Sequence, residues 1–209
     1  NTISVGEVGC SNGVRLEYFS KYFDSKYNLK LFGCDYSEYP LRLASDKGIT
    51  TFQGGMESLL DNAPYDILVL SHVFEHFIDL KASLILIDEL THDQSLVYVE
   101  VPGVIDLVNK KEYMYDYQDY TVLAHIHNFS LTTLSAVFKT QGFYLEKGVE
   151  YVRALFRKDI KVVQNVSENP YEEIIEALEN RDVKLAENLV REHALNLAAH
   201  VEKHVDYLS

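Results

Sequence analysis

The sequence predicts an α/β protein in which a mostly parallel, doubly wound sheet carries helices on both faces. Three observations lead to this fold class. Apolar runs bounded by Gly, Asn or Asp alternate with segments of helical periodicity over residues 1–100, as in strand-helix-strand units. Two closely spaced apolar runs, 143–147 and 152–157, predict an antiparallel strand pair after the parallel strands. The length of 209 residues suits one large domain with a short appendage.

The fold is expected to begin with a strand, a helix and a second strand. The apolar run 2–8 predicts a buried strand that ends in a glycine-rich turn. Apolar residues then recur at helical spacing between Val14 and Phe23. A second apolar run, 29–34, predicts the next strand, which ends at Asp35.

The same alternation continues to residue 101. Pattern and turn residues predict a short helix at 39–47, a weak strand at 50–52, a strong strand at 65–70, an amphipathic helix at 73–90 and a strand at 95–101. Pro102 and Gly103 end the last of these strands.

The alternation of strand and helix patterns ends in the acidic segment 104–128, which we expect to be a functional loop or lid. Its four closely spaced tyrosines suit either stacking on an acceptor or one face of a half-buried strand; they are Tyr113, Tyr115, Tyr117 and Tyr120. A helix at 131–141 then precedes the antiparallel pair. The polar stretch 165–170 predicts a boundary between a domain at 1–160 and a helical hairpin at 165–209, whose second helix is capped by Asp182.

Net charge, the length of apolar runs and the number of cysteines make several classes of protein function less compatible with this sequence. The formal charge of -13 disfavours direct binding to nucleic acid or to anionic lipid. We expect no membrane segment, because no apolar run reaches the length of a membrane span. Cys10 and Cys34 are the only cysteines and lack metal-site spacing, so we expect reduced thiols in a cytoplasmic protein.

A glycine turn and an acid suggest a ligand site. Glu7, Gly9, Ser11 and Gly13 alternate where the first strand turns into the first helix, and glycine there lets backbone N–H groups approach a ligand. Asp35 ends the next strand, where a carboxylate can accept hydrogen bonds from both hydroxyls of a ribose. The other interpretation is a tight turn with Asp35 as a helix cap.

These motifs resemble those of class I S-adenosylmethionine-dependent methyltransferases, over about residues 2–158. The resemblance extends to the fourth-strand motif, from Tyr65 to His76, and it implies a Rossmann-like sheet. Ser11 replaces the middle glycine of the family's first motif, and Gly55 stands where many relatives carry an acid. The resemblance implies S-adenosyl-L-methionine as cofactor, with contacts from Glu7, Gly9, Cys10, Ser11, Gly13, Asp35, Tyr36, Met56, Glu57, Ser71 and His72.

A histidine-carboxylate string follows the fourth strand. On the predicted helix 73–90, His72 and His76 would share one face with Glu75, so a metal ion could bind there. Some ubiquinone-pathway O-methyltransferases recruit a metal at the corresponding position, and inverted zinc proteases also carry the pattern. We nevertheless assign no metal ligand and expect Glu75 and His76 to anchor the chain by hydrogen bonds.

His125 is the candidate catalytic residue. The stretch from Ala124 to Ser130 resembles part of a motif of sugar C-methyltransferases, with His125 matching the family's histidine. Ala124 and Asn128 replace two of its partners, which favours O-methylation by an imidazole base over carbanion chemistry. A purely structural His125 is the other interpretation.

The leading hypothesis is methyl transfer to a small-molecule acceptor, such as a sugar or polysaccharide precursor. The alternatives are a non-catalytic nucleotide-binding module and a metal hydrolase. Family members carry helices before the first strand, which we expect to be missing from this sequence. The tail resembles the last helices in the ligand-binding domain of bacterial transcription regulators, and we expect it to pack on the domain or form a homodimer.

Overall fold

The computed structural model describes residues 2–23, 27–105 and 124–158. The chain divides into two units, Asn1–Gln164 and Asn165–Ser209, and all described residues belong to the first. The predicted hairpin and the tyrosine segment therefore lie outside the described residues, apart from the ends of that segment. In chain order the elements are β1 Thr2–Val8, α1 Val14–Phe23, β2 Asn28–Asp35, α2 Glu38–Ser45, β3 Thr50–Gln53, η1 Met56–Asn62, β4 Tyr65–Ser71, η2 Phe74–His76, α3 Leu80–Glu89, β5 Thr91–Glu100, α5 Leu131–Lys139, β6 Phe143–Val149 and β7 Arg153–Lys158.

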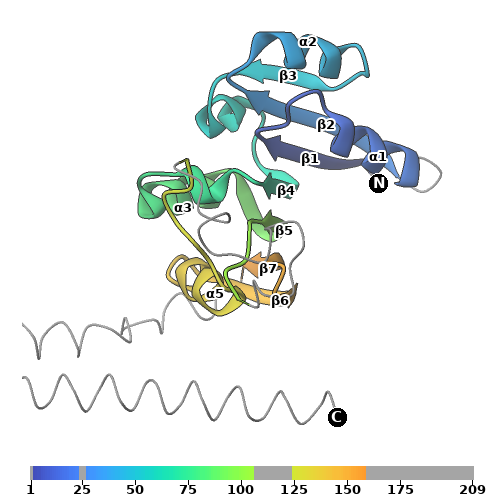
Figure 1. Cartoon of the computed structure of the whole chain (residues 1–209). Coiled ribbons are helices and arrows are strands. Elements are labelled where there is room, and N and C mark those ends of the chain that lie inside the picture. Colours follow the sequence, from blue (N-terminus) through green and yellow to red (C-terminus); the bar gives the residue numbers. More distant parts are fainter. Residues whose placement is uncertain (1, 24–26, 106–123, 159–209) are drawn as a thin grey trace, which may run out of the picture. The chain divides into compact units, whose positions relative to one another are not determined.

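The strands of the described residues form one seven-stranded sheet in the order β3-β2-β1-β4-β5-β7-β6 (Figure 1). The first five strands of this order are parallel, and β7 pairs antiparallel with both β5 and β6. The predicted sheet is thus confirmed.

The carboxyl ends of β1, β2 and β4 meet at one edge of the sheet. Val8 is paired with Cys34 on one side and with Leu70 on the other. The chain leaves β1 toward β2 and β3 and later returns to the other side of β1 with β4. Such a reversal in strand order leaves a crevice beyond the strand ends, which is where open α/β sheets bind ligands.

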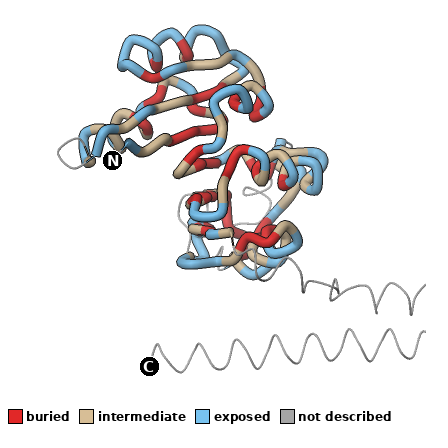
Figure 2. The backbone as a smooth tube through the Cα atoms, turned by 180° about the vertical axis from the view of Figure 1, so that it is seen from behind, coloured by how far each residue is buried: buried red, intermediate tan, exposed pale blue. Residues whose placement is uncertain are grey.

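Helices cover both faces of the sheet because successive strand side chains point to opposite sides. In β4, Leu68 and Leu70 belong to one buried apolar cluster and Val69 to another. The first cluster includes residues of α3 and α5, and the second includes residues of α1 and α2. Figure 2 shows buried stretches along the strands and mostly exposed residues along the outer helices.

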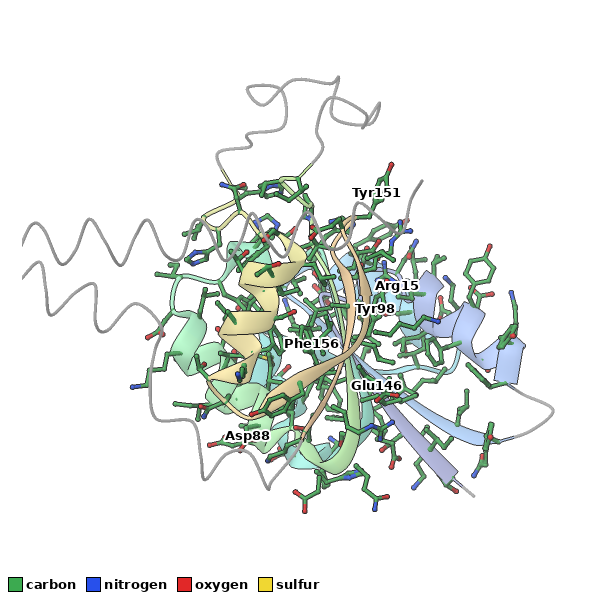
Figure 3. All side chains as sticks on the ribbon, turned by 90° about the horizontal axis from the view of Figure 1, so that it is seen from below. Arg15, Asp88, Tyr98, Glu146, Tyr151 and Phe156 are labelled. Carbon is green, nitrogen blue, oxygen red and sulfur yellow. The ribbon has the colours of Figure 1, made fainter. Side chains whose placement is uncertain are left out.

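The aromatic core lies on the α5 side of the sheet. Phe138 of α5 stacks on Phe156 of β7, with ring centroids 4.3 Å apart and planes at 9°. Phe74 contacts the same Phe138 ring from η2, with a centroid distance of 5.0 Å. Figure 3 shows Phe156 on the α5 side, whereas Tyr98 and Arg15 lie on the α1 side.

The predicted helix 73–90 is wrong in its first half. His72 has a φ of 56°, and only a short 3-10 turn, Phe74–His76, follows it. The α-helix α3 begins at Leu80 because the Asp79 side chain caps it, accepting a hydrogen bond from the Ala82 N–H at 2.9 Å. His72 and His76 therefore do not share a helical face. The sequence also did not predict the 3-10 helix η1.

No helix in the described part of the chain is long and apolar enough to cross a membrane.

Candidate functional site

A cavity of about 530 Å³ opens beyond the carboxyl ends of the parallel strands. Its walls come from the ends of β1 and β2, the turn before η1, the η2 segment and the start of α3. This volume lies within the range of cofactor sites. Five of the predicted cofactor residues line it: Gly9, Asp35, Tyr36, Met56 and Glu57.

Asp35 is half-buried at the cavity wall and joins two turns. Its Oδ2 accepts a hydrogen bond from the Ser11 N–H at 3.0 Å, and its Oδ1 accepts one from the Ser37 N–H at 2.9 Å. Each carboxylate oxygen has a second lone pair, so Asp35 can still accept hydrogen bonds from the two hydroxyls of a sugar. Asp35 is not turned into the core, and it fits the position expected of a ribose acceptor.

Backbone conformation shapes the glycine turn. Gly9 has a φ of 67°, and a Cβ at this position would clash with the Val73 Cγ1. Ser11 also has a positive φ, of 47°, although it carries a side chain. Its hydrogen bond to Asp35 compensates part of that strain. Gly13 has a φ of 69° and lies on neither cavity wall; a Cβ there would meet Ala44 at 3.0 Å.

The Glu57 carboxylate lies beside Gly55, the position at which many family members carry an acid. A Cβ on Gly55 would lie 2.5 Å from the Glu57 Oε2 and 2.6 Å from the Tyr36 hydroxyl. The Gly55 N–H donates to the Glu57 Oε1 at 3.2 Å. The space that a longer residue at 55 would fill is therefore occupied by the Glu57 carboxylate, which also lines the cavity.

A second cavity, of about 470 Å³, lies on the other side of Gly9. Glu7, Cys10, Ser11 and Ser71 also line it, so ten of the eleven predicted cofactor positions, all but His72, lie on a cavity wall or in the glycine turn. His72 is 54% exposed and lies next to Glu75 instead.

Glu7 is the buried charge of the second cavity. Its side chain is 1% exposed and forms an ion pair with Arg15 of α1, and its Oε2 has no hydrogen-bond partner among the described residues. Burial raises the pKa of Glu7 to about 7, although the Arg15 guanidinium opposes this shift. The site therefore holds a carboxylate that a cationic ligand group would stabilise.

The thiols beside the cavities are free and buried. Burial raises the pKa of Cys10 to about 12 and that of Cys34 to about 11. Neither thiol is a reactive nucleophile at neutral pH.

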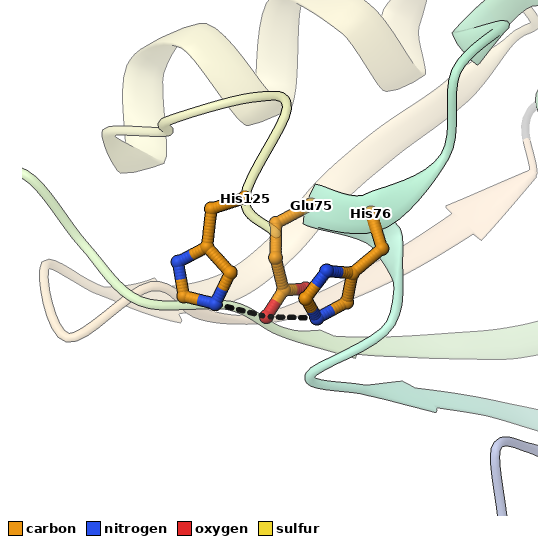
Figure 4. Close-up of side chains that lie close together, drawn as sticks. All are labelled: Glu75, His76 and His125. Carbon is orange, nitrogen blue, oxygen red and sulfur yellow. Dashed lines mark ion pairs between the residues drawn. The ribbon is translucent and has the colours of Figure 1, made fainter. Parts of the chain in front are cut away.

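Glu75, His76 and His125 converge beside the first cavity, which His76 also lines (Figure 4). The Glu75 Oε1 lies 3.8 Å from the His76 Nε2 and 4.0 Å from the His125 Nε2. The segment after β5 is held against η2 because the N–H groups of Ile126 and His127 donate to the Glu75 carbonyl at 3.0 and 3.1 Å. Residues 50 positions apart in the chain thus meet at one point.

Two of the imidazoles near Glu75, those of His125 and His72, differ in electrostatic environment. Burial lowers the pKa of His125, whose side chain is 16% exposed. The Glu75 carboxylate raises the pKa of the more exposed His72, with the Nδ1 3.7 Å from Oε1. At neutral pH, His125 is thus the imidazole more readily available as a proton acceptor.

Sequence reasoning missed several residues of this site. The cavity also contacts Val73, Phe77 and Leu86, and Glu100 ends β5 nearby, accepting hydrogen bonds from Ser71 at 3.1 Å and Arg153 at 2.6 Å. Asp79, a helix-capping residue, was the signal for the start of α3, and the continuous helix predicted at 73–90 concealed it.

The fold and the cavity are those of a doubly wound α/β protein with a ligand-sized cavity at the topological switch point of its sheet. Residues 2–147 match the family described as "Methyltransferase domain". This match covers more than half of the chain, so the chain belongs to this family, that of S-adenosylmethionine-dependent methyltransferases. The predicted family and enzyme class are confirmed, and solved structures with this fold hold S-adenosylmethionine or S-adenosylhomocysteine. No curated protein gives a significant match.

Solved structures share the fold at low sequence identity. The first is a Nostoc punctiforme protein whose assignment as an O-methyltransferase is provisional, with 17% identity, a TM-score of 0.54 and coverage of 74% of this chain and 51% of that one. The plantazolicin methyltransferase BpumL, in complex with a triazolic desmethylPZN analog and SAH, has 20% identity, a TM-score of 0.53 and coverage of 72% and 61%. A TehB-like S-adenosylmethionine-dependent methyltransferase from Corynebacterium glutamicum has 14% identity, a TM-score of 0.53 and coverage of 75% and 80%. This chain thus spans about half the length of the Nostoc protein.

The described residues fit the cofactor. Asp35 retains acceptor capacity at the cavity wall, and Gly9 leaves its backbone accessible between the two cavities. The unpartnered Glu7 oxygen suits the ammonium group of the cofactor's methionine part.

Proposed function

We propose that this protein transfers a methyl group from S-adenosylmethionine to a hydroxyl group of a small molecule, in the class of sugars or polysaccharide precursors. The observation that carries the proposal is an imidazole, His125, placed next to a residue of the cofactor cavity. The ring centroids of His125 and His76 are 5.0 Å apart, and His76 lines the cavity.

Different residues of the chain bind the three parts of the cofactor. Asp35 accepts hydrogen bonds from the ribose hydroxyls, while Tyr36, Met56 and Glu57 bound the adenine. Glu7, Cys10, Ser11 and Ser71 surround the methionine part. The cofactor supplies an activated methyl group, so the protein's contribution is chiefly to position the acceptor and exclude water.

His125 takes the proton of the acceptor hydroxyl. Its pKa, lowered by burial, keeps the ring neutral near pH 7, which a base requires. The resemblance of the segment from Ala124 to Ser130 to that of sugar methyltransferases supports the acceptor class. The absence of that motif's further partners, at Ala124 and Asn128, supports oxygen rather than carbon as the methylated atom.

Calorimetry with S-adenosylmethionine and S-adenosylhomocysteine, followed by transfer of a radiolabelled methyl group to sugars, nucleotide sugars and phenols, tests the proposal. We expect His125→Ala to lower kcat by about 10²- to 10⁴-fold with the Kd of the cofactor unchanged. Asp35→Ala should instead raise that Kd by about tenfold or more, because a charge-assisted hydrogen bond is worth about 1.5–3 kcal/mol.

His92→Asn is the matched control, because His92 lies near the amino-terminal end of β5, remote from the carboxyl edge. It should leave both constants unchanged. Transfer to a phenol or an amine, and not to a sugar, would overturn the acceptor class. Cofactor binding without transfer to any acceptor would favour the non-catalytic module.

A further inference from the structure

We infer that Glu75, His76 and His125 form a binding site for a divalent transition-metal ion of the zinc type. From the sequence we assigned no metal ligand, and the metal alternative used His72, Glu75 and His76 on one face of a helix that does not form there. The inferred site instead joins the segment after β4 to the segment after β5, and it rests on three observations.

The first observation is a carboxylate that is buried without a hydrogen bond. Glu75 is 1% exposed, and neither of its oxygens has a hydrogen-bond partner among the described residues. Burying a carboxylate without a hydrogen-bond partner is strongly unfavourable, which is why buried carboxylates are paired, protonated or bound to a metal. Glu7, which is also 1% exposed, has Arg15 as its ion-pair partner, whereas in the described part of the chain the groups of opposite charge type near Glu75 are imidazoles alone.

The second observation is the orientation of His76. Its Nδ1 lies 2.7 Å from the Ala124 carbonyl oxygen, and a carbonyl can only accept, so Nδ1 carries the proton. In the neutral ring the Nε2 then presents its lone pair, and it points toward the Glu75 Oε1 (Figure 4). A lone pair and a carboxylate oxygen repel each other unless a cation lies between them. A backbone carbonyl that fixes the distal nitrogen is the usual second partner of a metal-bound histidine.

The third observation is spacing. The three donor atoms lie within 4.8 Å of one another. From the two Glu75 distances, 3.8 and 4.0 Å, an ion at the centre would lie at most about 2.5 Å from each donor, against metal bonds of about 2.0–2.2 Å. Shifts of a few tenths of an ångström therefore complete the coordination.

The donor set selects the class of ion. Two imidazoles and one carboxylate suit zinc, cobalt or iron(II), whereas magnesium and calcium prefer oxygen ligands alone. Three protein ligands leave at least one position for water or for an oxygen of another molecule.

Metal binding does not depend on the proposed function, but it limits one step of it. An imidazole that binds the ion through Nε2 keeps its proton on Nδ1 and cannot also accept a proton from an acceptor. His125 thus acts as the base in the metal-free protein only. Binding and methyl transfer are measured separately, so either can fail without the other.

The test is titration of the chelator-treated full chain with Co²⁺, followed by visible absorption, and with Zn²⁺, followed by calorimetry. We expect one equivalent to bind with a shared site for both ions, and Mg²⁺ at the same concentration not to compete. His76→Ala and His125→Ala should each weaken binding by about 10- to 100-fold or more, as should Glu75→Gln, which retains the shape of the side chain.

Two controls separate this site from other histidines. His92→Asn should leave the affinity unchanged, and so should the combined substitution His193→Ala, His200→Ala and His204→Ala in the tail. Circular dichroism checks that each variant is folded, and the folded Glu75→Gln protein decides the case if an alanine variant fails. Absence of stoichiometric binding, or binding that survives Glu75→Gln and His125→Ala, would overturn the inference.

Discussion

The pH dependence of stability should reveal the buried carboxyl group of Glu7. Burial raises the pKa of Glu7 from 4.5 to about 7 in the folded protein. The folded state therefore binds this proton more tightly than the unfolded state, and stability falls as pH rises between these two values. A difference of roughly two to three pKa units, at about 1.4 kcal/mol each, amounts to about 3 kcal/mol.

The perturbation that tests this reasoning is Glu7→Gln, which keeps the shape of the side chain and cannot ionise. Urea unfolding at several pH values from 4.5 to 7.5 gives the free energy of unfolding of each protein. We expect the two proteins to be of similar stability at the lowest pH. The variant should become the more stable one by about 3 kcal/mol at pH 7.5.

Glu17→Gln is the matched control on the neighbouring helix. Hydrogen bonds from Lys21 and Lys47 lower the pKa of Glu17, so its contribution to stability is present at neutral pH and is lost as pH falls. The two variants should thus differ from wild type in opposite directions as pH rises. Parallel curves for wild type and Glu7→Gln would refute the account of Glu7 as a buried, weakly compensated acid.

Three further substitutions test the packing around the site by thermal or urea unfolding. Ser11→Gly should stabilise the protein by about 0.5–1 kcal/mol, because it relieves a left-handed conformation; equal or lower stability would contradict the strain. Gly33→Ala should destabilise it by about 1–3 kcal/mol, because its Cβ would lie 2.5 Å from the Cys10 Sγ; an unchanged midpoint would show that this contact relaxes freely. Phe138→Ala should cost about 3–5 kcal/mol, because the ring stacks on Phe156; a loss below 1 kcal/mol would argue against that packing.

The hydrophobic pattern predicted the sheet well because each central strand is one short, continuous stretch of mostly buried residues. The strands of the runs 2–8 and 65–70 are buried on both faces over their carboxyl-terminal halves, residues 5–8 and 68–71, as parallel strands covered by helices are. The prediction of a helix from residue 73 was wrong because the apolar residues continue at helical spacing through two separate elements, η2 and α3. The α-helix itself begins only after Asp79, which caps it. An apolar pattern records burial but not where hydrogen bonding is interrupted.

The site was predictable where it depends on neighbours in sequence. Gly9 and Asp35 belong to turns at strand ends, and parallel strands bring such turns to one edge whatever the details of packing. The metal interpretation failed at His72 for the opposite reason, since its geometry depended on the erroneous helix.

The sequence by itself determined the order of most strands and helices, the glycine turn, the place of Asp35 at the end of β2 and the family. Each of these follows from local conformational preference or from residues at fixed spacing. Only the tertiary structure decided that Glu75 is buried without a hydrogen-bond partner in the described ranges, that His76 turns its Nε2 toward it, and that His125 joins them from a distant segment. Burial and the meeting of remote side chains arise from packing of the whole sheet and its connections, which no local pattern encodes.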